Sequence, residues 1–158
     1  MIYRIPQGKH RARPLRFGLY FRQEFKWTIR FNDTSVYQID KQGDINKLCG
    51  IRYLFGDNSA RFGWRYVPDT GLIDIMAYVH DDGKVTKSER EIIITRVHPN
   101  ELCRLSLSVR NGLYWFNANG HPVKVVKTHH QKISFRQGLF FGGTTAAPHD
   151  ITVEIKTR

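Results

Sequence analysis

The feature that most constrains this chain is the alternation of apolar and polar residues at every second position. The clearest example is the run with Phe25, Trp27, Ile29 and Phe31. A period of two places these four side chains on one face of a strand and the polar residues between them on the other. No window of a dozen residues keeps apolar positions at helical spacing. The sequence therefore predicts an all-β protein.

Turn-forming residues separate the alternating runs. Pro68-Asp69-Thr70-Gly71 and Asp81-Asp82-Gly83 follow successive runs, and Asn119-Gly120 marks another turn. Asn111-Gly112 is the strongest hairpin signal, because both residues tolerate the left-handed torsions of a two-residue turn. About ten to twelve short strands with such turns fit two antiparallel sheets packed face to face. We expect a jelly-roll β-sandwich, with a closed barrel as the structural alternative.

The length of 158 residues and a hydrophobic content of 41% suit a single core. We expect that core to contain Trp27, Ile29, Phe62, Trp64, Ile75, Leu105, Leu107, Val153 and Ile155. Cys49 and Cys103 lie in apolar runs without the spacing of a metal or redox motif, so two buried thiols are expected. The apolar runs are far shorter than the roughly 20 residues of a membrane-spanning helix, so we expect no membrane partner.

The positive charge is concentrated at the N-terminus. The net charge is +11, and residues 1–31 hold eight of the Lys and Arg residues against one acidic residue. Residues 6–14 have too few hydrophobic side chains to offset the cost of ordering by burial. We therefore divide the chain into a basic arm, residues 1–16, and a β-sandwich domain, residues 17–158. The arm is expected to dock on other protein chains of an assembly through Arg4, Lys9, Arg11, Arg13 and Arg16.

Three parts of the sequence together resemble a known group of proteins: NSARFGWRY at 58–66, IMAYVH at 75–80, and LFFGGT with APHDITV between 139 and 153. They are similar to small uncharacterised bacterial and phage proteins with a concanavalin A-like jelly roll, the lectin and glucanase sandwich. The resemblance covers the chain from about Lys9 onward and implies that fold. Enzymatic branches of this sandwich carry paired acids, as Glu-x-Asp-x-x-Glu, or an Arg/Gln/His/Tyr set for lyase chemistry. This sequence lacks both patterns.

Other candidate centres do not meet the requirements of catalysis or metal binding. Glu89 and Glu91 have the spacing of a paired-acid site, but they lie in a highly charged stretch typical of a solvated strand end. His129 and His130 are adjacent, so on a strand they point to opposite faces. The acidic turn at 81–83 offers too few oxygens for calcium. We therefore predict no catalytic residues, no metal and no cofactor.

Aromatic residues raise the alternative of a sugar-binding protein. Trp115 alternates with Tyr114 and Phe116, so one face of that strand must present an aromatic ring to solvent. If the protein has a carbohydrate platform, we expect it at Tyr114, Trp115 or Phe116, with Asn117 and Asn119 beside it.

The leading hypothesis at this stage is a non-catalytic interaction module that serves as a structural component of a larger assembly, such as a phage virion. The alternatives are a lectin-type carbohydrate-binding protein and a polysaccharide-acting enzyme. Residues 16–22 interleave basic and aromatic side chains, as nucleic-acid-binding surfaces do, but no RNA-recognition motif is present and we do not expect nucleic acid. The sequence shows no signal peptide, so we expect synthesis in the cytoplasm.

Overall fold

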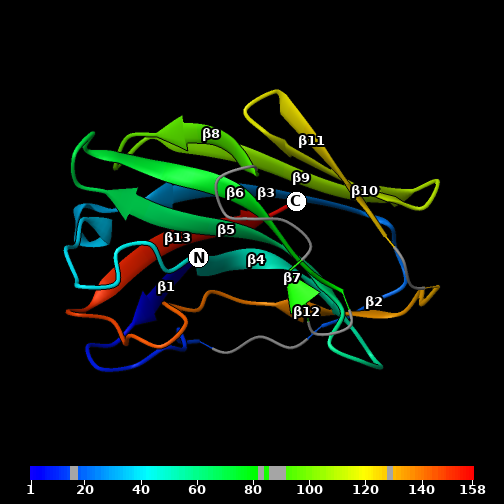
Figure 1. Cartoon of the computed structure of the whole chain (residues 1–158), viewed down its shortest axis with the longest axis horizontal. Coiled ribbons are helices and arrows are strands. Elements are labelled where there is room, and N and C mark those ends of the chain that lie inside the picture. The colour runs from blue at the N-terminus through cyan, green and yellow to red at the C-terminus, as the bar shows by residue number, and fades with distance from the viewer. Residues whose placement is uncertain (15–17, 82–83, 86–91, 128–129) are drawn as a thin grey trace.

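The strands of the protein form two antiparallel sheets packed face to face (Figure 1). This computed structural model describes residues 1–14, 18–81, 84–85, 92–127 and 130–158. Within them, the helical structure is one 3-10 turn, η1 (Asp33–Ser35). No helix in this part of the chain is long and apolar enough to cross a membrane. The predicted all-β jelly-roll sandwich is confirmed.

The two sheets differ in size. The six-stranded sheet has the order β1 (Ile2–Ile5), β13 (Ile151–Thr157), β3 (Glu24–Phe31), β9 (Leu102–Arg110), β10 (Leu113–Ala118) and β11 (His121–Val126). The seven-stranded sheet has the order β2 (Leu19–Tyr20), β12 (Ser134–Gln137), β4 (Asn46–Tyr53), β5 (Ser59–Val67), β6 (Leu72–Asp81) and β7 (Lys84–Val85), and β8 (Ile93–Val97) also pairs with β6. Neighbouring strands are antiparallel throughout, so every row of paired residues shares one face.

The predicted hairpins are present where the turn residues lie. Asn111 and Gly112 both have positive φ, 52° and 68°, between β9 and β10. Asn119 joins β10 to β11 with a φ of 51°. The turn at 68–71 joins β5 to β6. The predicted turn at 81–83 includes residues 82 and 83, which lie outside the described residues.

The core lies between the sheets and is rich in aromatic rings. All nine predicted core residues are buried. Trp64 illustrates the packing, because its ring centroid lies 4.9 Å from that of Phe31 and 5.8 Å from that of Tyr37. Cys49 and Cys103 are free, buried thiols, as predicted. Burial raises the pKa of both, that of Cys103 to about 12, so both are protonated at neutral pH.

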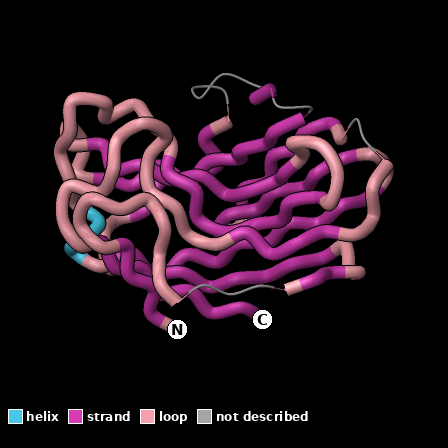
Figure 2. The backbone as a smooth tube through the Cα atoms, turned by 90° about the horizontal axis from the view of Figure 1, so that it is seen from below, coloured by secondary structure: helices cyan, strands magenta, loops and turns pink. Residues whose placement is uncertain are grey.

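The N-terminal arm packs on its own domain. β1 pairs with β13 at the edge of the six-stranded sheet, and Figure 2 shows the two termini near each other. The Gly8 amide donates to the Ala147 carbonyl at 2.9 Å, and the Ala12 amide donates to that of Leu139 at 3.3 Å. These hydrogen bonds order the arm on its own domain, so its order does not by itself require a partner chain.

Charged arm residues also contact their own domain or lie beside it. Arg4 forms an ion pair with Asp150, and Arg11 bridges to Phe140 through the backbone. Docking of the arm on another protein chain is not tested by the single chain and stays a prediction. Arg16 and the predicted boundary after residue 16 lie outside the described residues.

Candidate active site

Strand register brings side chains from four strands together on the outer face of the seven-stranded sheet. Gln137 of β12 pairs with Gly50 of β4, Gly50 pairs with Arg61 of β5, and Arg61 pairs with Tyr78 of β6. The next row on the same face, two residues farther along each strand, contains Phe135, Arg52, Ser59 and His80. Because antiparallel partners project to the same side, Arg61, Tyr78, His80 and Gln137 share one face of the sheet.

Gly50 allows the backbones of β4 and β5 to approach closely within this row. A Cβ atom at Gly50 would lie 2.3 Å from the Ala60 carbonyl oxygen and 2.6 Å from Arg61 Cα, which is closer than real contacts allow. Arg61 and Gln137, which lie on either side of Gly50 in the row, both line one cavity of about 340 Å³. The close approach of β5 to β4 at Gly50 therefore lies beside this cavity.

A hydrogen-bonded series links three side chains beside Arg61. His80 Nδ1 lies 3.3 Å from Asp57 Oδ2, and His80 Nε2 lies 3.0 Å from the Tyr78 hydroxyl oxygen. A carboxylate can only accept a hydrogen bond, which assigns the imidazole proton to Nδ1 and leaves Nε2 as the acceptor for the Tyr78 hydroxyl. This arrangement can move a proton from Tyr78 to His80 while Asp57 stabilises the resulting imidazolium.

Cations surround the Tyr78 ring. Lys47 Nζ lies 5.1 Å and Arg61 Cζ lies 5.6 Å from the ring centroid. Burial lowers the pKa of the Arg61 guanidinium, because the charged form loses hydration there. Among the described residues, the buried Arg61 Nε and Ser59 Oγ have no hydrogen-bond partner. A partly buried guanidinium is suited to bind an anionic group, because the ligand replaces the hydration that burial removes.

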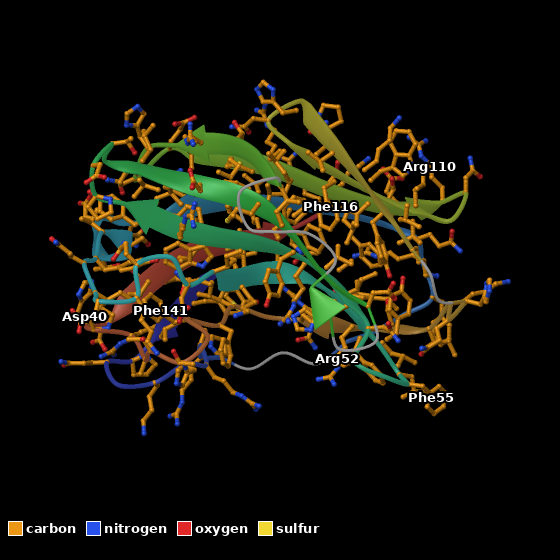
Figure 3. All side chains as sticks on the ribbon, viewed as in Figure 1. Asp40, Arg52, Phe55, Arg110, Phe116 and Phe141 are labelled. Atoms are coloured by element: carbon orange, nitrogen blue, oxygen red, sulfur yellow. The ribbon has the colours of Figure 1, made fainter. Side chains whose placement is uncertain are left out.

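The cavity is basic on several sides. Four arginines line it from the arm and from three strands of the sheet: Arg11, Arg52, Arg61 and Arg136. Arg52 lies toward the same end of the molecule as Phe55, at the tip of the β4–β5 hairpin, whereas Asp40 and Phe141 lie toward the other end (Figure 3). Asp57 Oδ1 lies 3.7 Å from Arg52 Nη2, so the Asp57 carboxylate contacts both Arg52 and His80. The cavity can accommodate a ligand that carries negative charge and hydroxyl groups.

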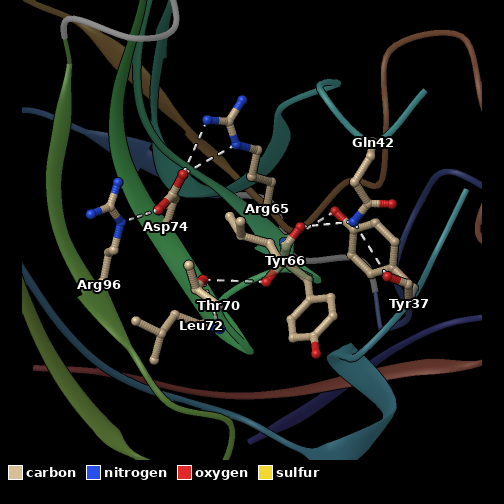
Figure 4. Close-up of polar contacts among 9 residues, drawn as sticks. Tyr37, Gln42, Arg65, Tyr66, Thr70, Leu72, Asp74 and Arg96 are labelled. Atoms are coloured by element: carbon tan, nitrogen blue, oxygen red, sulfur yellow. Dashed lines mark hydrogen bonds and ion pairs between the residues drawn. The ribbon is translucent and has the colours of Figure 1, made fainter. Parts of the chain in front are cut away.

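A second cluster of charges lies farther along the same sheet (Figure 4). The buried Asp74 carboxylate accepts hydrogen bonds from Arg65 at 3.1 Å and from Arg96 at 2.9 Å. Arg65 and Asp74 are paired across β5 and β6, while Arg96 comes from β8. Two arginines around one acid leave this part of the face with a net positive charge.

The predicted carbohydrate platform lies on the opposite sheet. Tyr114 and Phe116 are buried in the core and offer no surface for a sugar, because β10 directs them between the sheets. Trp115 and Asn117 face outward, and Asn119 is exposed. Asn117 Oδ1 accepts from the Gly120 amide at 2.9 Å and stabilises the β10–β11 turn. Asn119 Oδ1 accepts from the Arg104 amide at 2.8 Å and links that turn to β9.

The catalytic and metal candidates that the sequence analysis set aside lie in part beyond what the structure describes. Glu89, Glu91 and His129 lie outside the described residues. The part of the chain that the structure describes holds no cluster of three or more His, Cys, Asp or Glu side chains that could bind a metal ion.

Sequence reasoning missed Arg61, Tyr78, His80 and Gln137 as a set, although a usable signal was present. The Pro68–Gly71 turn fixes the β5–β6 register, and extending that register pairs Arg61 with Tyr78. No linear motif contains these residues, because they come from three strands and meet only across the sheet.

Comparison with known proteins gives matches at the level of fold. The sequence matches no known protein family and no curated protein. Among solved structures, alginate lyase AlyC3 superposes with a TM-score of 0.62 and 11% identity over 99% of this chain and 74% of its own. An alginate lyase from Pseudomonas aeruginosa gives 0.58 and 14%, over 88% of this chain and 66% of its own. A polysaccharide lyase of family 18 gives 0.55 and 8%, over 100% and 87%.

These neighbours correct the leading hypothesis drawn from the sequence. They are lyases that act on polysaccharides, and they contradict a non-catalytic structural module without catalytic residues. Their sandwich agrees with the concanavalin A-like fold, and neither they nor the structure supports a virion component. This chain spans 66% of the P. aeruginosa lyase and 61% of the family 7 alginate lyase A1-II′, in each case less than two thirds. At these identities the likeness establishes the fold alone.

Proposed function

We propose that this protein is a lyase that cleaves an acidic polysaccharide next to a uronate residue. The observation that carries the proposal is the hydrogen-bonded series Asp57, His80 and Tyr78 beside the desolvated Arg61. Such a site combines an anion-binding group with a proton-transfer pair, which are the two requirements of β-elimination from a uronate.

Arg61 takes the substrate carboxylate in this proposal. A uronate carries its carboxylate on C5, and the C5 proton is weakly acidic because the negative charge left after its removal spreads onto that carboxylate. A guanidinium binds both carboxylate oxygens through its planar fork and stabilises this charge. Gln137 lines the same cavity and can donate its amide to the carboxylate or to a hydroxyl.

Tyr78 and His80 then move the protons. The Tyr78 hydroxyl gives its proton to His80 Nε2, and the phenolate oxygen takes the proton from C5. The C5 electron pair forms a C4–C5 double bond, and the bond between C4 and the glycosidic oxygen breaks. Protonated His80 gives its proton to that oxygen, so Tyr78 and His80 both return to their starting states. Asp57 stabilises the imidazolium in between.

The remaining arginines support a substrate with more than one carboxylate. Arg11 and Arg52 line the cavity beside Arg61 and can bind neighbouring uronates of the same chain. Two solved neighbours support the choice of substrate class: AlyC3 has been determined in complex with dimannuronate, and a variant of A1-II′ in complex with the substrate GGMG. Polymannuronate is therefore the first substrate to test.

The test is to incubate the purified protein with polymannuronate and to determine the masses of the products. A lyase gives fragments with an unsaturated end, each lighter by one water than the product of hydrolysis. We expect that unsaturated series. Products with the mass of hydrolysis fragments would overturn the elimination chemistry. Binding without any product would instead favour the lectin-type alternative, provided that other acidic polysaccharides also remain uncleaved.

A further inference from the structure

The outer face of the six-stranded sheet carries a second arrangement suited to an acidic ligand. A single row of paired residues crosses four strands there: Glu24, Ser108, Trp115 and Lys124. At the usual strand spacing the row is ~14 Å long. We call this row, together with its neighbours Arg110, Ser106 and Asn117, the Trp115 surface. It faces away from the site at Arg61, because the two sheets present opposite outer faces.

Two cations lie against the Trp115 ring. Arg110 Cζ is 4.4 Å and Lys124 Nζ is 4.2 Å from the ring centroid, within the range of cation–π attraction. The ring is thus not a bare platform for a neutral sugar. It holds two positive charges at fixed positions on the sheet, and Figure 3 shows Arg110 well away from Arg52 of the first site. This favours an anionic ligand.

A groove of about 700 Å³ runs beside the ring and offers polar groups between the charges. Ser106 and Ser108 line it with hydroxyls that can donate and accept, as sugar hydroxyls require. The one carboxylate of its lining, Glu24, is bonded by Lys26 at 2.8 Å, and this contact lowers the Glu24 pKa. Two arginines of the lining, Arg22 and Arg110, outnumber that acid, and Lys124 adds a further charge against the Trp115 ring, so this surface is positive overall.

We infer that the Trp115 surface is a non-catalytic binding site for an acidic polysaccharide, separate from the site at Arg61. Carboxylates of the ligand contact Arg110 and Lys124, and its hydroxyls contact the two serines. The inference takes from the proposed function only the class of ligand. Two binding faces on one domain hold a long polymer more strongly than a short fragment, because the second contact is made at high effective concentration.

Polysaccharide fits this surface better than nucleic acid does. Single strands are bound on successive bare aromatic rings, each stacking one base. Here one indole serves the groove, and two cations already lie against it. The surface therefore lacks a row of free stacking platforms in the described part of the chain.

The test measures retention of the protein in native gels that contain polymannuronate. The variant Arg110→Ser/Lys124→Ser removes two charges from the Trp115 surface. The matched control Arg104→Ser/Lys156→Ser removes two charges from the same outer face without a contact to Trp115. Both are prepared with Arg61→Gln, which disables the first site. We expect binding about fivefold weaker in the first variant and less than twofold weaker in the control.

Each outcome of this experiment decides the inference. Equal losses in both variants would show general charge attraction and overturn it, as would single-stranded RNA that competes as strongly as the polysaccharide. No retention with Arg61→Gln alone would also overturn it, since one site would then account for all binding. The proposed function is tested separately by the unsaturated products of the wild-type protein, so it can stand or fall independently.

Discussion

The two outer faces of the sandwich are built by the same alternation of residues, yet their polar side chains differ in burial and in hydrogen bonding. On the seven-stranded sheet, Arg61 is desolvated, and His80 and Tyr78 are hydrogen-bonded to each other. On the six-stranded sheet, Arg110 and Lys124 remain exposed and rest on one indole ring. Desolvation and fixed hydrogen bonds prepare groups for chemistry, whereas exposed cations support binding only. The comparison predicts catalysis on one face and attachment on the other.

The largest expected difference between the faces is in turnover. Arg61→Lys keeps the charge but loses the planar fork that binds both carboxylate oxygens. We expect kcat/KM on polymannuronate to fall by about 10²–10³-fold, the usual loss when one preorganised donor is removed. Arg65→Lys, four residues along the same strand, is the control and should change it by only a few fold. Equal losses of kcat/KM in both variants would contradict a specific role of Arg61 in catalysis.

A second substitution tests how the first face is shaped. Gly50→Ala places a Cβ atom against the Ala60 carbonyl oxygen and Arg61 Cγ. We expect a loss of about 1–3 kcal/mol in the free energy of unfolding, as for other overpacked sites, together with lower activity. The control is Gly43→Ala, where a Cβ would meet nothing within 4 Å. Denaturant unfolding measures both, and an unchanged midpoint for Gly50→Ala would show that β4 can move aside.

A smaller effect is expected at the far end of the same face. Asp74→Ala removes the acid shared by Arg65 and Arg96. The free energy of unfolding should fall by about 1 kcal/mol, less than for a fully buried pair, because the Arg96 side chain is 55% exposed and water can replace its partner. Asp40→Ala, at an exposed loop position, should leave the unfolding midpoint unchanged. A stabilised Asp74→Ala variant would contradict this interpretation.

The smallest effect is expected when substitutions on the six-stranded sheet are tested with a short substrate. Arg110→Ser/Lys124→Ser should leave kcat/KM on a mannuronate trisaccharide within about twofold of the wild type, because one short fragment cannot span both faces. The comparison of the two faces would fail if this double substitution slowed the trisaccharide reaction as strongly as Arg61→Lys.

Much of the fold could be predicted from local patterns. Alternation from Phe25 to Phe31 and the Asn111-Gly112 turn identified strands and a hairpin because both signals act over a few residues. The arm could not be placed this way. Its strand β1 is stabilised by β13 at the other end of the chain, a contact that leaves no trace in local sequence.

The candidate site could likewise be predicted only in part from local patterns. Arg61, Tyr78 and His80 lie within 20 residues, and the hairpin register that unites them follows from one turn. Gln137 joins them only because β12 pairs with β4, which no local pattern indicates. The sequence required an outward aromatic ring on β10 but left open which one. The structure turns Trp115 outward and buries Tyr114 and Phe116, since only alternate residues of a strand can face outward.

The most direct test of catalysis on the seven-stranded sheet is the initial rate of unsaturated-product formation by Tyr78→Phe. This substitution removes the hydroxyl that His80 holds and leaves the ring in place. We predict a rate about 10²–10⁴-fold below the wild type, the range for loss of an acid–base group, with trisaccharide binding preserved within a few fold. Tyr66→Phe, on the neighbouring strand β5, should react at the wild-type rate. A Tyr78→Phe variant that also forms unsaturated products at the wild-type rate would contradict the account.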